Sequence, residues 1–235
     1  MKWTEKRHDA VLETGVCRHL HAVRVRHLLD EIAAFADGAN GLRVLDVGCG
    51  DGVITRRIHE ALPAAHVEAV DADDVRLRRA LAVCPGVRFH HADVSALPFR
   101  EDAFDVVVCH HVIEHVGDDR RLLAEIHRVL AKDGLLLLGL PQEGGVVGRI
   151  LRTLHRKLYA EGEHVNFYTI RTMRAMLAAQ GFGDLRCAKF GFLFPHYYVH
   201  IALLSNPVTF RLGHLVSQRA DWAADSLIFS ARKRA

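Results

Sequence analysis

Residues 44–52 read Val-Leu-Asp-Val-Gly-Cys-Gly-Asp-Gly, and this stretch decides the fold. A short apolar run leads directly into a loop with glycine at three alternate positions, Gly48, Gly50 and Gly52. Glycine tolerates positive φ and lets a ligand approach the backbone closely. A helical pattern follows at 53–62, so the loop opens onto a helix N-terminus with free N–H groups and partial positive charge. The stretch therefore predicts a strand, a ligand-binding loop and a helix.

The residues around this loop indicate which ligand it binds. A dinucleotide site needs the spacing G-x-G-x-x-G, but Val53 stands where the third glycine belongs. A Walker phosphate loop is excluded, because no Gly-Lys-Ser/Thr follows. Asp46 and Asp51 add two carboxylates beside the loop, which disfavour a diphosphate and favour an ammonium or sulfonium ion.

Two further acids follow the next two predicted strands. Asp71 ends the second strand, where a carboxylate can accept hydrogen bonds from both hydroxyls of a ribose. Asp93 closes the third strand, where it can accept a hydrogen bond from an adenine amino group. Ligands of open α/β sheets bind at the carboxyl ends of the strands. The acids together predict an adenosine that carries a positively charged, phosphate-free tail.

Strand and helix patterns alternate on both sides of the loop. Alternation of this kind predicts βαβ units and a doubly wound, mostly parallel sheet, which is an α/β fold of the Rossmann-like kind. The predicted strands are 42–47, 66–70, 87–90, 104–109 and 135–140, and the predicted helices are 53–62, 74–83 and one that is capped by Asp118 or Asp119 and ends at Gly134.

The two ends of the chain are predicted to flank this sheet within one domain. Residues 1–41 are expected to form an N-terminal helical lid, 42–141 the cofactor-binding core, and 142–235 a substrate-facing segment. That last segment is predicted to contain a glycine-rich loop at 142–148, a helix between Thr169 and Gly181, an aromatic stretch from Phe194 to Phe210, late strands at 185–192 and 226–231, and a solvated tail at 232–234.

Composition excludes several classes of protein. The chain has 235 residues, of which 50% are apolar and 25% charged, as expected for a globular domain and not for a disordered one. No apolar run approaches the ~20 residues of a membrane span, and the charged first residues do not indicate a secretory signal. The net charge of +3 is spread along the chain, which does not predict nucleic-acid binding. Five scattered cysteines without a C-x-x-C motif fit a reducing cytoplasm.

Five motifs in order make the sequence resemble the class I S-adenosylmethionine-dependent methyltransferases that act on small molecules. The resemblance covers 42–141, and two departures are a Lys132-Asp133-Gly134 turn in place of the usual Pro-Gly pair and a loose match at 167–169 with 181–182. The motifs are 44–52, Val70-Asp71, Ala92-Asp93-Val94 with Leu97-Pro98-Phe99, 104–107 with His115-Val116, and 126–130 leading to Gly134 and Pro141.

The resemblance implies S-adenosylmethionine as the cofactor and a small molecule as the methyl acceptor. The cofactor-binding residues that it implies are Asp46, Gly48, Cys49, Gly50, Asp71, Ala72, Asp93, Val94, His110 and His111. We expect methylation of oxygen first and of nitrogen second, in a biosynthetic and cytoplasmic setting, with no membrane and no nucleic-acid partner. The alternatives are another reaction of a sulfonium cofactor, such as aminopropyl transfer or a lyase reaction, and a non-catalytic subunit that binds an adenosyl ligand.

Methyl transfer from a sulfonium is an in-line displacement, and positioning supplies much of its acceleration. A hydroxyl acceptor also needs a general base, for which the candidates are His164, His111 and His115, with Tyr168 orienting the acceptor. For each histidine, a purely structural role is the competing interpretation. Residues 111–115 also match the H-x-x-E-H pattern of some zinc peptidases. Because that run follows a buried strand directly and no distal carboxylate ligand is identified, we expect no metal.

Overall fold

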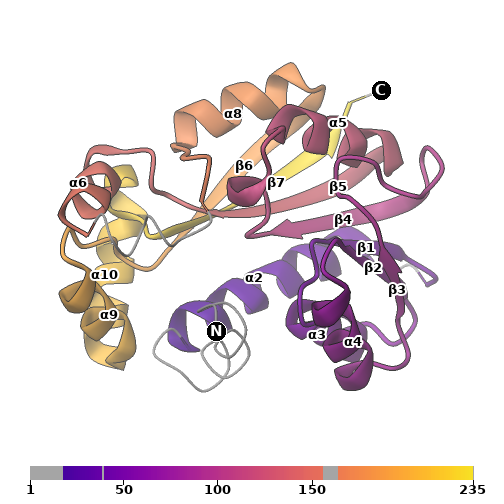
Figure 1. The fold of residues 1–235 in the computed structure, drawn as a ribbon, viewed down its shortest axis with the longest axis horizontal. Helices are drawn as coiled ribbons and strands as arrows, with labels where there is room; N and C mark the ends of the chain where they lie inside the picture. Colours follow the sequence, from indigo (N-terminus) through magenta and orange to yellow (C-terminus); the bar gives the residue numbers. More distant parts are fainter. Residues whose placement is uncertain (1–17, 39, 156–163, 235) are drawn as a thin grey trace.

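The computed structural model describes residues 18–38, 40–155 and 164–234. These residues form one seven-stranded sheet in the order β3-β2-β1-β4-β5-β7-β6 (Figure 1). Strands β1 to β5 pair in parallel, whereas β7 is antiparallel to both of its neighbours. The predicted doubly wound, mostly parallel sheet is therefore confirmed. The strands are β1 Arg43–Val47, β2 His66–Asp71, β3 Arg88–His91, β4 Phe104–His110, β5 Leu130–Pro141, β6 Phe182–Phe190 and β7 Ser226–Lys233.

Helices cover both faces of the sheet, in two layers that Figure 1 shows above and below the strands. Alternate strand residues face opposite layers: Val44 packs in one buried cluster and Leu45 in the other. Burial on both faces explains why the strands are apolar runs and not alternating patterns. The upper layer contains α5 Asp119–Val129 and α8 Ile170–Ala179, and the lower layer contains α2 Arg18–Ala36, α3 Val53–Ala61 and α4 Asp74–Val83.

The helices α6, α9 and α10, which follow β5 in the chain, lie on the left of Figure 1, toward which the arrow of β4 points. Here the prediction of a loop at 142–148 is wrong in its last part, because α6 Val146–Leu154 already begins there. The aromatic stretch forms α9 Tyr197–Ser205 and α10 Pro207–Arg219, and Phe210 is buried in the lower cluster. Two short 3-10 turns, η2 Ile113–His115 and η3 Asp221–Ala223, complete this side.

Other predicted boundaries are also wrong, and the late strand that was predicted at 185–192 is β6, which covers 182–190. The helix that was expected to end at Gly134 ends at Val129, and Leu130 already pairs with Phe104 in the sheet. The tail at 232–234 is largely structured, since β7 runs to Lys233. The Nζ atom of Lys233 donates hydrogen bonds to Asp102 Oδ1 and to the Leu130 carbonyl, both at 2.7 Å.

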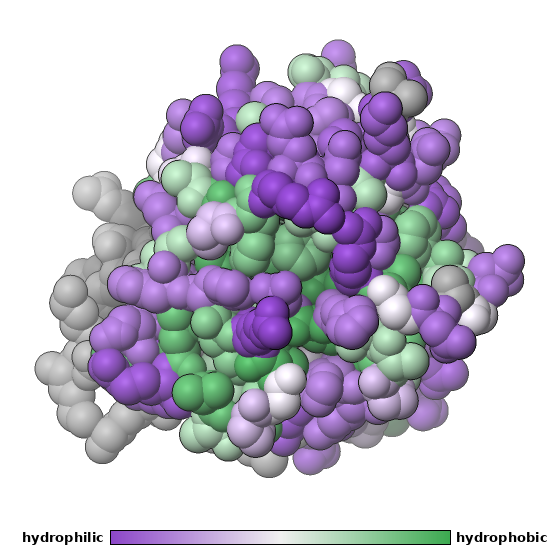
Figure 2. All heavy atoms as spheres, turned by 90° about the vertical axis from the view of Figure 1, so that its right-hand side faces the viewer, coloured by the Kyte–Doolittle hydropathy of each residue, from purple (hydrophilic) through white to green (hydrophobic). Residues whose placement is uncertain are grey.

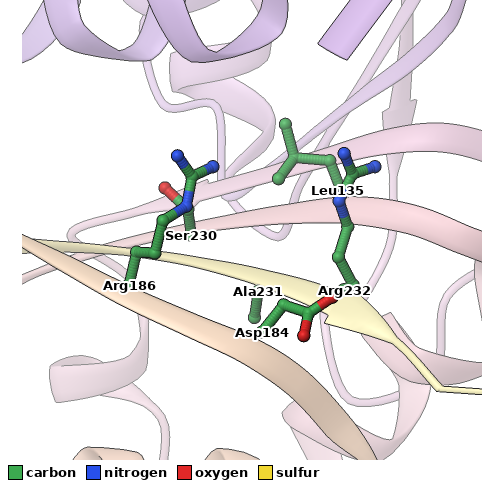
Figure 3. A pocket seen from close by; sticks show the side chains of 6 residues that line it. All are labelled: Leu135, Asp184, Arg186, Ser230, Ala231 and Arg232. Atoms are coloured by element: carbon green, nitrogen blue, oxygen red, sulfur yellow. The ribbon is translucent and has the colours of Figure 1, made fainter. Parts of the chain in front are cut away.

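Helix α2 is part of the lower core. Its Leu28 and Ile32 are fully buried against the sheet. A cavity of about 220 Å³ lies on this face, and Arg186 and Arg232 project side by side from its lining (Figure 3). Both arginines bind α2, because Arg186 pairs with Glu31 at 2.7 Å and Arg232 lies 4.4 Å over the Phe35 ring. This cavity therefore belongs to helix packing. Residues 1–17 of the predicted lid lie outside the described residues.

A larger hollow of about 460 Å³ lies at the amino ends of the parallel strands, lined among others by Arg43, His66 and Phe104. Figure 2 views the molecule from this side, where hydrophilic residues surround a central band of apolar ones. Ligands of open α/β sheets bind at the opposite, carboxyl end. The functional site is therefore expected at the carboxyl ends of the parallel strands, the end toward which the arrow of β4 points in Figure 1. Among the described helices, none is long and apolar enough to cross a membrane.

Candidate active site

The glycine loop connects β1 to α3 through three residues with positive φ, at 71° for Gly48, 55° for Gly50 and 80° for Gly52. The first of these also has a steric reason to be glycine. A Cβ at Gly48 would lie 2.3 Å from Cγ2 of Val112, which follows β4. The loop and the end of β4 are therefore packed directly against each other, so that both border the same crevice.

The loop uses its own N–H groups to hold its shape. Gly48 and Cys49 both donate to the Val70 carbonyl, at 2.7 and 3.1 Å. Gly50 donates to Asp71 Oδ2 at 2.7 Å, and Gly52 donates to the Cys49 carbonyl at 3.0 Å. A pyrophosphate site depends on loop N–H groups that point at the ligand. All four of these N–H groups donate to oxygens of the protein and are therefore not available to a phosphate, which agrees with a phosphate-free ligand.

Asp46 is a buried carboxylate beside this loop. It accepts a hydrogen bond of 2.6 Å from the Thr55 hydroxyl of α3 and is 2% exposed. Burial, with a smaller contribution from the nearby charge of Asp71, outweighs the hydrogen bond from Thr55 and raises the pKa of Asp46 from 3.8 to about 6. A buried carboxylate of this kind gains from a cationic ligand more than an exposed one does.

Asp71 lies at the end of β2, facing the loop. Its Oδ2 accepts from Gly50 and its Oδ1 from the Asp73 N–H at 2.9 Å. Each carboxylate oxygen has a second lone pair for a ligand hydroxyl. Asp51 differs from the sequence interpretation, because Arg76 and Arg79 lie 3.7 and 3.5 Å from its oxygens and offset its charge.

The end of β3 supplies the third acid. Asp93 is exposed, and its Oδ1 accepts from the N–H and hydroxyl of Ser95, at 2.8 and 2.7 Å, which lowers its pKa. Ala72, predicted to bind the cofactor, is exposed near this end, and His91 bonds its carbonyl at 2.9 Å. The side chain of Val94 is buried in the upper core. Only its backbone therefore remains for a ligand.

Cys49 and His110 are both predicted to bind the cofactor, and Cys49 is buried while His110 is half-buried. Burial raises the pKa of the Cys49 thiol far above its usual range, so this cysteine is a small neutral residue. Burial also favours the neutral form of His110, in this case by lowering the pKa of the imidazole, and the nearby His111 and Arg24 add to the effect. A Cβ at Gly139 would lie 2.3 Å from the His110 ring, so glycine on β5 makes room for this imidazole.

The hydrogen bonds of His111 fix its tautomer. Arg24 Nη1 lies 2.7 Å from His111 Nε2, and a guanidinium can only donate. Nε2 therefore accepts, and Nδ1–H donates to Glu114 Oε1 at 2.8 Å. Burial lowers the pKa of His111, and Arg24 adds to this. His111 is thus a neutral imidazole whose lone pair is occupied, which disfavours its predicted use as a base.

His115 and His164 come together beside Glu114. One carboxylate oxygen of Glu114 and one ring nitrogen from each histidine lie within 4.8 Å of one another. His164 Nδ1 donates to Glu143 Oε2 at 2.9 Å, which leaves Nε2 with its lone pair. Burial opposes protonation of His164, but the hydrogen bond and charge of Glu143, together with the charge of Glu114, raise its pKa.

Tyr168 lies beside η2 but is not one of the three residues of this cluster. Its ring is 5% exposed and packs in the upper core. Its hydroxyl donates to Asp119 Oδ2 at 2.7 Å and contacts the Ile113 carbonyl at 3.3 Å. The hydroxyl proton is therefore committed within the protein, a structural arrangement that does not favour the predicted role in orienting an acceptor.

Backbone contacts dock the segment after residue 163 onto η2. The N–H groups of Val165 and Asn166 both donate to the Glu114 carbonyl, at 2.8 and 3.1 Å. Sequence reasoning missed Glu114, Glu143 and Arg24 as members of the site. The H-x-x-E-H spacing was the available signal for Glu114, and the position of Glu143 just after the fifth strand was the signal for that residue.

The sheet order, the glycine loop and the acids at three strand ends define a class I S-adenosylmethionine-dependent methyltransferase. Residues 45–138, less than half of the chain, match the family described as "Methyltransferase domain". Its cofactor is S-adenosylmethionine.

Two curated relatives illustrate the range of the family. The chain is 32% identical over 155 residues to malonyl-(acyl-carrier protein) O-methyltransferase of Geobacter sulfurreducens, covering 63% of this chain and 58% of the relative. It is 26% identical over 129 residues to ubiquinone biosynthesis O-methyltransferase of Rickettsia prowazekii, covering 54% and 50%. The matches thus span about half the length of these relatives.

A solved structure supports the fold over most of the chain. Phosphoethanolamine N-methyltransferase 2 of Haemonchus contortus, in complex with S-adenosyl-L-methionine, superposes with a TM-score of 0.66. The superposition covers 89% of this chain and 53% of that one, at 18% identity. The arrangement of strands and helices is therefore shared well beyond the segment that the sequence matches cover.

Proposed function

We propose that this protein transfers the methyl group of S-adenosylmethionine to an oxygen atom of a small molecule. The observation that carries the proposal is the glycine loop, whose four internally bonded N–H groups lie beside the buried carboxylates of Asp46 and Asp71. Such a loop suits a cationic nucleoside and not a phosphorylated one.

Each acid has a distinct part in holding the cofactor. Asp71 accepts hydrogen bonds from the ribose hydroxyls, and Asp93 accepts one from the adenine amino group. Asp46 offsets the positive charge of the methionine portion. Gly48 and Gly50 keep the backbone bare where the cofactor crosses the loop, and His110 borders the methyl group from β4.

The reaction is a single displacement. The acceptor oxygen forms a bond to the methyl carbon as the bond from that carbon to sulfur breaks, and the sulfonium becomes the neutral thioether of S-adenosylhomocysteine. The acceptor hydroxyl also loses its proton, which leaves to solvent past His115 and His164. Because sulfur is a good leaving group, alignment of oxygen, carbon and sulfur supplies most of the acceleration.

The choice of oxygen rests on similarity. Both curated relatives described above are named O-methyltransferases, whereas the solved neighbour is an N-methyltransferase. Nitrogen is therefore the second candidate acceptor. The biosynthetic role, the cytoplasmic location and the lack of a nucleic-acid partner belong to the same proposal.

Calorimetry and labelled cofactor test the proposal. S-adenosylhomocysteine should bind the purified chain, and NAD or ATP should not. Incubation of methyl-labelled S-adenosylmethionine with a panel of phenols, carboxylic acids and amines should move the label to an acceptor. Transfer of an aminopropyl group or release of methylthioadenosine would identify another sulfonium reaction, and binding without turnover would identify a non-catalytic subunit.

A further inference from the structure

We propose that Glu114, His115 and His164 form a binding site for one divalent transition-metal ion at the carboxyl end of β4. The three residues offer one carboxylate oxygen and two ring nitrogens within 4.8 Å of one another. Donors that share an ion at ~2.1 Å lie roughly 3–3.5 Å apart, so small side-chain rotations complete the set. Two imidazoles and a carboxylate suit Zn²⁺, Mn²⁺, Fe²⁺ or Co²⁺ better than Ca²⁺ or Mg²⁺.

The buried carboxylate of Glu114 is the independent observation. Glu114 is 0% exposed. Its Oε1 accepts from His111, but its Oε2 has no hydrogen-bond partner among the described residues. A buried carboxylate oxygen without a partner is costly, and a coordinated cation would remove that cost. Glu114 is therefore better explained as a ligand than as a packing residue.

The residues around the three ligands are arranged as outer-shell partners. Metal-binding histidines commonly donate their other ring N–H to a carboxylate, which fixes the ring and its tautomer. His164 donates Nδ1–H to Glu143 at 2.9 Å, so its Nε2 lone pair faces away from that bond. His111 donates to Glu114 and orients the ligating carboxylate in the same manner.

The position of the cluster gives the ion a chemical role, which rests on the proposed function. Glu114 and His115 lie in η2, next to Val112, which packs on Gly48 of the cofactor loop. An ion held there would lower the pKa of an acceptor hydroxyl that touches it, and the proton would leave to solvent. The proposal reassigns His115 and His164 from candidate bases to ligands, and it departs from the sequence expectation of no metal.

Cobalt titration of metal-stripped, untagged protein tests the site, because Co²⁺ absorbance reports nitrogen and oxygen ligands. We expect one equivalent to bind, and His115→Ala and His164→Ala each to weaken binding at least tenfold. His115 is exposed, so its substitution does not endanger folding. Glu143→Gln should weaken binding by 10- to 100-fold while leaving all three ligands in place.

His90→Ala is the matched control. His90 is also half-buried and lies 2.6 Å from a glutamate, Glu68, but outside the cluster. The His90→Ala variant should bind Co²⁺ with the same affinity as the unaltered protein. No Co²⁺ binding, or equal affinity in the cluster variants and the control, would overturn the proposal. Calorimetry with S-adenosylhomocysteine keeps the two ideas apart: if this ligand binds and Co²⁺ does not, only the metal site fails. If Co²⁺ binds and the nucleoside does not, only the proposed function fails.

Discussion

Asp46 is held in the folded chain as a carboxylate that burial disfavours. Burial raises its pKa from 3.8 to about 6, so between these values the folded state binds more protons than the unfolded state. Stability therefore falls as the pH rises through this window, and above it the ionised group costs about 3 kcal/mol. The ionised carboxylate of Asp46 therefore lowers the stability of the ligand-free fold and at the same time favours the binding of a cation.

Asp46→Asn separates these two effects. Asparagine keeps an acceptor for the Thr55 hydroxyl and removes the charge. We expect the melting temperature of the ligand-free protein at pH 7.5 to rise, and the affinity for S-adenosylmethionine to fall at least tenfold. Scanning calorimetry and titration calorimetry measure the two quantities. An unchanged affinity would contradict the assignment of Asp46 to the cationic portion of the cofactor.

The pH dependence of binding follows from the same pKa. As the pH falls from 7.5 through about 6, Asp46 becomes protonated and loses its attraction for the cofactor. Affinity for S-adenosylmethionine should be nearly constant well above pH 6, begin to fall as the pH approaches 6, and continue to fall below it. Titration calorimetry in several buffers measures the affinity and the protons exchanged. Asp46→Asn should flatten the profile, and a profile of the same shape in that variant would assign the dependence to another group.

Asp71→Ala tests the ribose assignment. The carboxylate accepts from Gly50 and Asp73 and is expected to accept from both ribose hydroxyls. Its loss should weaken binding of S-adenosylhomocysteine at least tenfold. The matched control is Asp74→Ala, which removes a nearby acid of α4 that pairs with Arg78 at 2.8 Å. Equal affinities of the two variants would remove the ribose assignment.

At the scale of elements, the loop between β1 and α3 combines two constraints that substitution can separate. Gly48→Ala adds both left-handed strain at φ 71° and a contact of 2.3 Å with Val112. Gly41→Ala adds the strain alone, since Gly41 has φ 77° and nothing within 4 Å of the added carbon. We expect roughly 1 kcal/mol of destabilisation from strain and 1–3 kcal/mol more from overpacking at Gly48.

Chemical denaturation measures both variants. Adding Val112→Ala to Gly48→Ala should recover part of the lost stability, because it removes the methyl group that collides with the new side chain. Equal destabilisation at Gly41 and Gly48 would show that the packing of the loop against the end of β4 contributes nothing.

The elements that sequence reasoning placed well are those whose pattern is local. The run of 74–83 has an aspartate cap and an apolar face, and α4 has those bounds. Helix α5 was extended too far because Leu130 continues its apolar pattern, yet this residue pairs with β4. Helix α6 was missed because its first turn carries Gly148, which packs closely against the Glu143 backbone.

The residues of the site likewise fall into those that a local sequence pattern could place and those that it could not. Asp46 and Asp71 lie at the carboxyl ends of β1 and β2, and Asp93 lies just after β3, so the rule for parallel sheets was enough to place them at one edge. The meeting of Glu114 with His164 depends on how the chain returns after α6, which no local pattern encodes. Arg24 reaches His111 from a helix 87 positions earlier in the chain. Contacts of this kind are set by tertiary packing.

At the scale of the molecule, the sheet order predicts a gradient of stability. The central strands β1 and β4 are paired on both sides and covered by both helix layers, whereas β3 and β6 are edges. We expect amides of β4 to exchange slowest with solvent deuterium and those of β3 much faster. Strand β6 pairs only with β7, so β6 should never be better protected than β7. Mass spectrometry of exchanged peptides measures this order, and slower exchange in β6 than in β7 would contradict it.

The placement of β7 between β5 and β6 has a consequence for synthesis on the ribosome. Strands β1 to β5 and their helices can associate while the nascent chain is still growing, because each pairs with a segment already made or soon to follow. Strand β6 leaves the exit tunnel before its only neighbour exists. It must remain unpaired until residue 233 has emerged, and during this interval it is the segment that most needs protection from wrong partners.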